Sequence, residues 1–255
     1  MRKSGGTNHI TIVSFSGIDG AGKSTQIDIV LQRLQQMGMT TKLIRFWDDV
    51  AQLTCVRESA GHAFFKGDKG IGSPDAPICR RDKNIRTWPM TCVRMVLYFI
   101  DAISARIAIH KIFRDHADFV VFDRYCYDEL ANLNLRNPVL RIYVQLLMRL
   151  IPKLTRSYLL DAYPADAHAR KPEYPIDFVY ANRAAYLELN KQTQRLTVLA
   201  PMNKGATAEA ILRFTSDDLQ TLLNLRECDR NIYGSPSASA EMLDGEEIRP
   251  ATSYE

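Results

Sequence analysis

The sequence predicts an α/β fold in which a parallel five-stranded sheet carries helices on both faces. Three observations predict it. Short apolar runs rich in β-branched residues alternate along the chain with longer segments whose apolar residues recur at helical spacing. Such alternation is typical of parallel sheets covered on both sides. The third observation is the length of 255 residues, which suits one sizeable domain better than two.

The first strand and helix enclose a glycine-rich motif. The strand is predicted over 10–15, and the helix that follows has its apolar residues at positions 27, 29, 30, 31 and 34. Between them the sequence Gly-Ile-Asp-Gly-Ala-Gly-Lys-Ser, residues 17–24, matches the phosphate-binding loop without a mismatch. A chance glycine turn is the alternative, but the strand, loop and helix context favours the P-loop NTPase fold.

Each residue type in this motif has a chemical purpose. Glycines let backbone N–H groups turn toward a polyphosphate, and the helix N-terminus adds its positive dipole. Lys23 would reach the β- and γ-phosphates as a catalytic residue, and the Ser24 hydroxyl would bind Mg²⁺. We therefore expect ATP as phosphoryl donor and Mg²⁺ as cofactor. The predicted ATP-binding residues are Gly17, Asp19, Gly20, Ala21, Gly22, Lys23, Ser24 and Thr25.

The remaining elements follow from the same patterns. Strands are predicted over 41–46, 119–122, 157–160 and 196–199, and helices over 47–60, 90–114, 138–150, 177–194 and 206–225. The stretch 62–87 is rich in glycine, proline and basic residues, and we interpret it as a long inserted loop, either functional or a solvated insertion. The predicted domain covers 1–227. Residues 228–255 are predicted to form a disordered acidic tail.

Charge and cysteine content limit the classes of function. The net charge is +4, and from Gly234 onward the chain carries five acidic residues and one arginine, so the preceding part has a charge of +8. A positive body suits a protein that handles phosphates, and we expect no nucleic-acid partner because no nucleic-acid module is recognisable. The five cysteines are scattered, which indicates free thiols in a reducing cytoplasm and argues against zinc. No apolar run is long enough for a membrane span.

Polar residues follow two of the predicted strands. In parallel sheets, ligands bind beyond the carboxyl ends of the strands. Asp123 follows the third strand, and we expect it to hold Mg²⁺ with Ser24; a helix cap or a plain ion pair is the alternative. Arg124, beside it, is expected to clamp a phosphate as a catalytic residue, with an exposed surface arginine as the alternative.

A basic segment follows the fourth strand. We interpret residues 162–176 as a lid that would close over ATP, exclude water and bring positive charge to the transferred phosphoryl group. The candidates are Arg170, also assigned as catalytic, Lys171, and Arg183 on the next helix. A solvated basic helix face is the alternative.

Four stretches of the chain resemble thymidylate kinases. These are Phe-Ser-Gly-Ile-Asp-Gly-Ala-Gly-Lys-Ser-Thr-Gln (15–26), Asp-Arg-Tyr (123–125), Ser-Tyr-Leu-Leu-Asp with Pro164 (157–161), and Asn-Arg-Ala-Ala-Tyr-Leu (182–187). The resemblance spans about residues 10–215. It implies ATP-dependent phosphorylation of a nucleoside monophosphate, most simply dTMP to dTDP. It also implies that Asp19 lies near the acceptor sugar and Arg124 at the acceptor phosphate, while Arg170 and Lys171 assist transfer.

The acceptor half departs from that family. Arg45 begins the sequence Arg-Phe-Trp-Asp-Asp-Val where the family usually has Arg-Glu-Pro-Gly-Gly-Thr, and Ser16 stands where many members have Glu. Tyr98 either stacks on a base or belongs to the core. The predicted acceptor-binding residues are Asp19, Arg45, Tyr98 and Arg124. Two alternative functions stay open: a kinase for a nucleoside, a modified nucleotide or a phosphorylated metabolite, and a non-catalytic nucleotide-binding regulator. Nucleotides are the expected partners, with a homodimer as a possible assembly.

Overall fold

The computed structural model describes residues 10–51, 88–114 and 117–217. The chain divides into two units, Met1–Phe214 and Thr215–Glu255, and the first unit contains every feature discussed below. The predicted inserted loop (62–87), the domain end at 227 and the acidic tail (228–255) lie outside the described residues.

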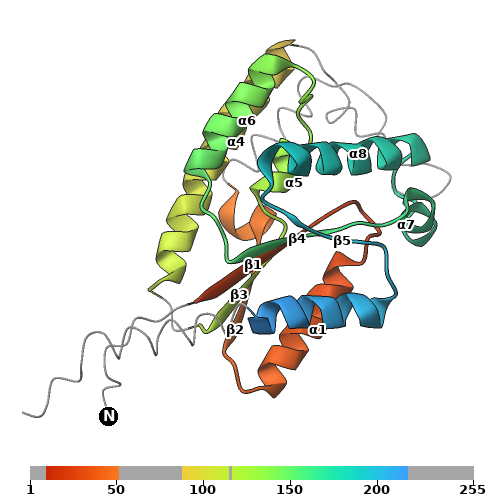
Figure 1. The fold of residues 1–255 in the computed structure, drawn as a ribbon. Coiled ribbons are helices and arrows are strands. Elements are labelled where there is room, and N and C mark those ends of the chain that lie inside the picture. The colour runs from red at the N-terminus through yellow and green to blue at the C-terminus, as the bar shows by residue number, and fades with distance from the viewer. Residues whose placement is uncertain (1–9, 52–87, 115–116, 218–255) are drawn as a thin grey trace, which may run out of the picture. The chain divides into compact units, whose positions relative to one another are not determined.

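Five strands of the described residues form one parallel sheet, which confirms the predicted fold class (Figure 1). The strands are β1 (Thr11–Ser16), β2 (Thr41–Arg45), β3 (Phe119–Asp123), β4 (Arg156–Leu160) and β5 (Thr197–Leu199). Their order across the sheet is β2-β3-β1-β4-β5, so the central strand β1 pairs with β3 on one side and β4 on the other. The carboxyl ends of these three strands therefore meet at one edge of the sheet, where ligands of open α/β sheets bind.

Side chains of alternate strand residues enter two separate cores, as a strand period of two requires. Ile12 and Val120 pack on one face of the sheet, whereas Val13 and Val121 pack on the other. The first face is covered by α4 (Trp88–Ile112), α5 (Cys126–Leu130), α6 (Pro138–Leu150) and α8 (Ile176–Thr193). The second face is covered by α1 (Lys23–Gln36) and by helical residues 204–214. Helices thus lie on both faces, as the sequence predicts.

Three local features differ from the sequence prediction. In the described part of the helix predicted over 47–60, Phe46–Val50 form a single π-helical turn, η1, and the backbone of Ala51 is extended, while 52–60 lie outside the described residues. The turn forms because the Asp49 carboxylate accepts a hydrogen bond from the backbone N–H of Arg45 at 2.7 Å. Two short helices were not predicted, α5 and α7 (Pro164–Arg170). Proline occupies the first turn of α7, where its missing N–H leaves no hydrogen bond unmade.

Two further sequence expectations concern cysteines and membranes. Cys92 and Cys126, the cysteines of the described segments, are free thiols. Within the same segments, no helix combines the length and apolar character that a membrane crossing requires.

Candidate active site

The phosphate loop joins β1 to α1 in the predicted strand-loop-helix order. Gly20 has φ +81°, and a Cβ at this position would collide with the backbone carbonyl of Ala167 in α7. Gly22 is the N-cap of α1 at φ +88°, and a Cβ there would meet nothing within 4 Å. Glycine is therefore required at one position by a close backbone approach and at the other by backbone conformation. The open space beside Gly22 leaves the helix N-terminus accessible to an anion.

Lys23 is folded back against its own loop. Its ammonium donates hydrogen bonds to the backbone carbonyls of Gly17 at 2.8 Å and Ile18 at 2.9 Å, and lies 3.8 Å from Asp19 Oδ1. The side chain is only 8% exposed. Burial, helped by the nearby charge of Arg124, lowers the pKa of Lys23 to about 8, and carboxylates including Asp19 and Asp123 oppose the shift. The Lys23 side chain therefore loses its proton, and with it its positive charge, near pH 8.

This pKa predicts a pH-dependent affinity for ATP. Polyphosphate oxygens favour the charged lysine, so binding above pH 8 requires the uptake of a proton. We expect the Kd for ATP to rise by about tenfold per pH unit above pH 8, measured by calorimetry from pH 7 to 9.5. Lys23→Arg is the matched control, because a guanidinium stays charged throughout this range, and its affinity should be nearly independent of pH. A wild-type Kd that stays constant up to pH 9.5 would contradict the prediction.

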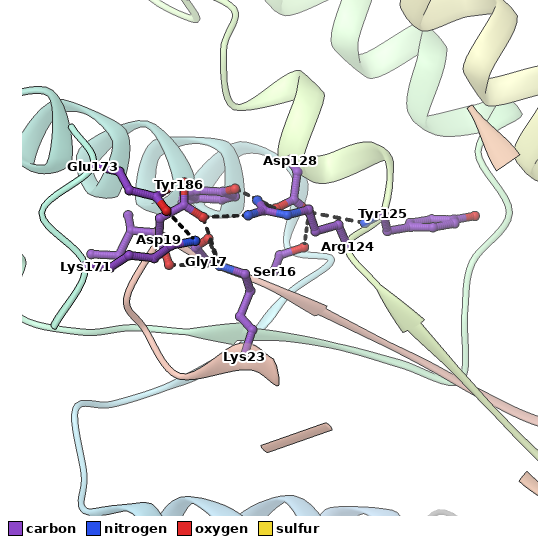
Figure 2. A network of polar contacts seen from close by, with 11 residues as sticks. Ser16, Gly17, Asp19, Lys23, Arg124, Tyr125, Asp128, Lys171, Glu173 and Tyr186 are labelled. Carbon is purple, nitrogen blue, oxygen red and sulfur yellow. Dashed lines mark hydrogen bonds and ion pairs between the residues drawn. The ribbon is translucent and has the colours of Figure 1, made fainter. Parts of the chain in front are cut away.

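Arg124 lies between two carboxylates at the end of β3 (Figure 2). Its guanidinium donates from Nη2 to Asp19 at 2.6 Å and from Nη1 to Asp128 at 3.2 Å. Burial would lower the pKa of Arg124, but the Asp128 and Asp19 charges outweigh it and raise this pKa further. The residue adopts φ +69°, and its backbone N–H donates to the Phe15 carbonyl at 3.1 Å. The unusual backbone conformation directs the side chain to the glycine loop instead of along the strand.

Asp128 is the centre of this network, and the sequence interpretation missed it. Its carboxylate is buried and accepts four hydrogen bonds: from Ser16 Oγ (2.6 Å), Tyr186 Oη (2.7 Å), the Tyr125 backbone N–H (3.2 Å) and Arg124. A carboxylate that accepts from this many donors fixes its partners in place. Its position four residues after Arg124, in the first turn of a short helix, was the one sequence signal available.

A cavity of about 430 Å³ lies beside the loop on the β4 and β5 side. It is bounded by Gly22 and Thr25 of the loop and α1, by Asp161 after β4, by Arg170 at the end of α7, and by residues 200–204. A cavity of this size accommodates a small-molecule ligand, and it opens beside the phosphate loop.

The three lid candidates have different partners. Arg170 lines this cavity and donates from Nε to the Asp166 carbonyl of its own helix at 3.0 Å. Arg183 forms a two-pronged ion pair with Asp161, with distances of 2.6 and 2.7 Å, and this hydrogen bonding raises its pKa. Lys171 pairs with Glu173 at 3.2 Å, on the side of Asp19 away from Tyr125 in Figure 2. Of the three, Arg170 is the one that borders the cavity.

The other predicted site residues do not take part in the network around Arg124 and Asp128. Tyr98 of α4 is 8% exposed and belongs to the hydrophobic core, and Arg45 is exposed at the end of β2. Ser24 is exposed in the first turn of α1, and Asp123 is half-buried at the end of β3, paired in register with Phe15. Among the described residues, no group of three or more His, Cys, Asp or Glu side chains can hold a metal by itself.

The sheet order and the glycine loop define an α/β protein with the phosphate-loop fold. Among solved structures, the chain is similar to thymidylate kinase from Ehrlichia chaffeensis, with a TM-score of 0.49 and 16% sequence identity. The match covers 80% of this chain and 98% of that one. No family model matches the sequence, and no curated protein does. The side chains of the site are therefore what indicates the function.

Proposed function

We propose that the protein transfers a phosphoryl group from ATP to a nucleoside monophosphate, with dTMP as the first acceptor to test. The observation that carries this proposal is the position of Asp19. Its carboxylate lies 3.8 Å from the ammonium of Lys23 and 2.6 Å from the guanidinium of Arg124. One cation belongs to the donor loop and the other to the neighbouring strand end, so two phosphates bound to them would lie side by side. This is the geometry that direct phosphoryl transfer needs.

Each residue then has a defined part in the reaction. The loop N–H groups and Lys23 would bind the ATP phosphates, Arg124 would hold the acceptor phosphate, and Arg170 would bring positive charge from the lid. Mg²⁺, bound near Ser24 and Asp123, would neutralise charge on the donor phosphates. Asp128, Ser16 and Tyr186 would keep the Arg124 guanidinium in position through the hydrogen bonds described above.

The decisive experiment is a phosphorylation screen of purified protein with ATP and Mg²⁺ against all common nucleoside monophosphates and nucleosides. We expect ADP formation that depends on a monophosphate, and none when Mg²⁺ is chelated. ATP binding without turnover on any acceptor would favour the non-catalytic regulator instead.

A kinase for a different acceptor is the second candidate. The segment after β2, where the resembling family holds its acceptor, forms the π-helical turn η1 stabilised by Asp49. An enzyme discriminates between acceptors by the polar groups that each acceptor satisfies. A different structure in the segment after β2 would therefore change which acceptor is preferred. The same screen separates this candidate from a dTMP kinase by the acceptor that gives the highest kcat/KM.

The position of Arg170 predicts a specific kinetic effect. The side chain is exposed and bound only to its own helix in the described contacts, so a charge offered mainly to the transition state should affect kcat. We expect Arg170→Ala to lower kcat by about tenfold or more, with the KM for ATP changed less. The control is Arg149→Ala, an exposed arginine in the last turn of α6. A rise in KM with unchanged kcat would exclude the lid role.

We also propose that two copies associate through α4 and α6, which contact one another. Both helices present apolar residues at helical spacing that are 39–61% exposed: Val93, Val96, Phe99, Ile103 and Ile107 on α4, and Val139, Ile142 and Leu146 on α6. Exposed apolar patches of this extent mark interaction surfaces, and a two-fold pair covers the same face of both copies.

Introducing negative charge on this apolar face tests the assembly. Val96→Glu combined with Ile142→Glu should convert a dimer into a monomer in light scattering coupled to gel filtration, because two carboxylates per copy would be buried. Met37→Glu is the matched control: Met37 is 66% exposed and follows α1. A monomeric wild-type protein would refute the proposal.

A further inference from the structure

A second cavity, of about 220 Å³, lies at the amino ends of β4 and β5. The cavity beside the phosphate loop contacts Leu160 and Asp161, whereas this one contacts Arg156 and Ser157, so the two lie at opposite ends of β4. It is therefore separate from the candidate active site, and the proposed reaction makes no use of it.

The lining of this second cavity is strongly basic. Lys153, Arg156 and Arg195 contribute three positive charges, and none of the described residues that line it is acidic. Hydroxyl and amide groups, including Ser157 and Gln194, make up the rest of its polar surface. Lys153 is exposed, and the Arg156 guanidinium lies over the Phe214 ring at 5.1 Å. Like charges that line one cavity repel one another, and an anion bound there would relieve that repulsion.

Arg195 supplies the second, independent observation. Its Nη1 is buried and has no hydrogen-bond partner in the described part of the chain, whereas Nη2 donates to the Met148 carbonyl at 3.4 Å. Burial raises the pKa of Tyr127 to about 12, and the charge of Arg195 opposes this rise, so the guanidinium lies near that ring in the cavity wall. A buried charged donor without a partner is unfavourable, and an oxyanion in the cavity would satisfy it once the guanidinium turns toward the cavity.

We propose that this cavity binds a phosphate oxyanion, either inorganic phosphate or the phosphate group of a monoester. Its volume is below the range of cavities that enclose a whole drug-sized ligand, so the recognised part is the phosphate itself. Arg195 would hold it with charge-assisted hydrogen bonds, and Lys153 and Arg156 would add electrostatic attraction.

Calorimetric titration with inorganic phosphate tests the proposal on the full chain carrying Lys23→Ala, which weakens phosphate binding at the loop. We expect saturable binding at one site, and Arg195→Gln should weaken it by about tenfold or more. Arg149→Gln, which removes an exposed arginine outside the cavity, is the matched control at the same ionic strength. Equal phosphate affinity in the Arg195→Gln and Arg149→Gln proteins would overturn the proposal, as would a lack of saturable binding.

Two further titrations test the proposal, one with a second variant and one with a phosphomonoester. Lys153→Gln alters an exposed side chain, so it should fold normally and weaken phosphate binding severalfold even if Arg195→Gln proves unstable; unchanged affinity in this variant would count against the proposal. A parallel titration with AMP identifies the source of the phosphate. Tighter AMP binding that Arg195→Gln abolishes assigns a phosphomonoester, and binding of inorganic phosphate alone assigns the free ion. Neither arm depends on kinase activity.

Discussion

Lys23→Ala is expected to abolish phosphoryl transfer while leaving the fold intact. The ammonium is buried in the glycine loop, where it donates to the Gly17 carbonyl; in the proposed reaction it would turn to phosphate oxygens that become more negative during transfer. Loss of such a group lowers kcat by on the order of a hundredfold or more, measured as ADP formation at saturating ATP. The melting temperature should change little. The variant loses the hydrogen bonds of the ammonium, but it also avoids the free-energy cost of burying a charged group, the same cost that lowers the pKa of Lys23.

The control for this variant is Lys191→Ala, which removes an exposed lysine in the last turn of α8. It should retain wild-type turnover. If Lys23→Ala also retained wild-type turnover, the loop would not be the donor site, and the proposed reaction would have to be abandoned.

Arg124→Ala is expected to have the second-largest effect, and mainly on the acceptor. Its guanidinium bridges Asp19 and Asp128, and without it two negative charges would face an acceptor phosphate. We expect kcat/KM for the acceptor to fall by about a hundredfold or more, with the Kd for ATP within a few-fold of wild type. Arg124→Lys should recover only part of the loss, because an ammonium cannot reproduce the planar two-sided contact.

Calorimetric ATP binding separates this variant from Lys23→Ala. Asp128 retains its hydrogen bonds from Ser16, Tyr186 and the Tyr125 N–H, so Arg124→Ala should remain folded and bind ATP. Arg149→Ala again provides the surface control. An equal loss of affinity for ATP and for acceptor would show that Arg124 serves the donor side.

The fold could be predicted from the sequence because its signals are local. Helix α6 coincides with the predicted residues 138–150, since the Asn137 side chain accepts from the Val139 N–H and Pro138 fixes the first turn. The strands follow from buried β-branched residues within a few positions of one another. The π-helical turn η1 could not be predicted, because it depends on one carboxylate, that of Asp49, which binds a backbone N–H four residues earlier.

The candidate site was predictable only in part, because only some of its contacts are local in the sequence. The loop residues form a contiguous motif, so Lys23 and its glycines are found from sequence. Asp128 meets Ser16 across 112 positions and Tyr186 across 58, contacts that exist only once α5 and α8 pack against the sheet. The sequence predicts Arg183 as a lid cation, and its ion pair with Asp161, 22 positions earlier, could not be foreseen from the sequence.

The close approach of Gly20 to α7 has a mechanical consequence. A side chain at position 20 would overlap the backbone carbonyl of Ala167, so the loop and α7 can lie this close together only while the residue is glycine. Arg170 lies three residues further along α7 and borders the cavity. We expect Gly20→Ala to push α7 away from the loop and to move Arg170 with it.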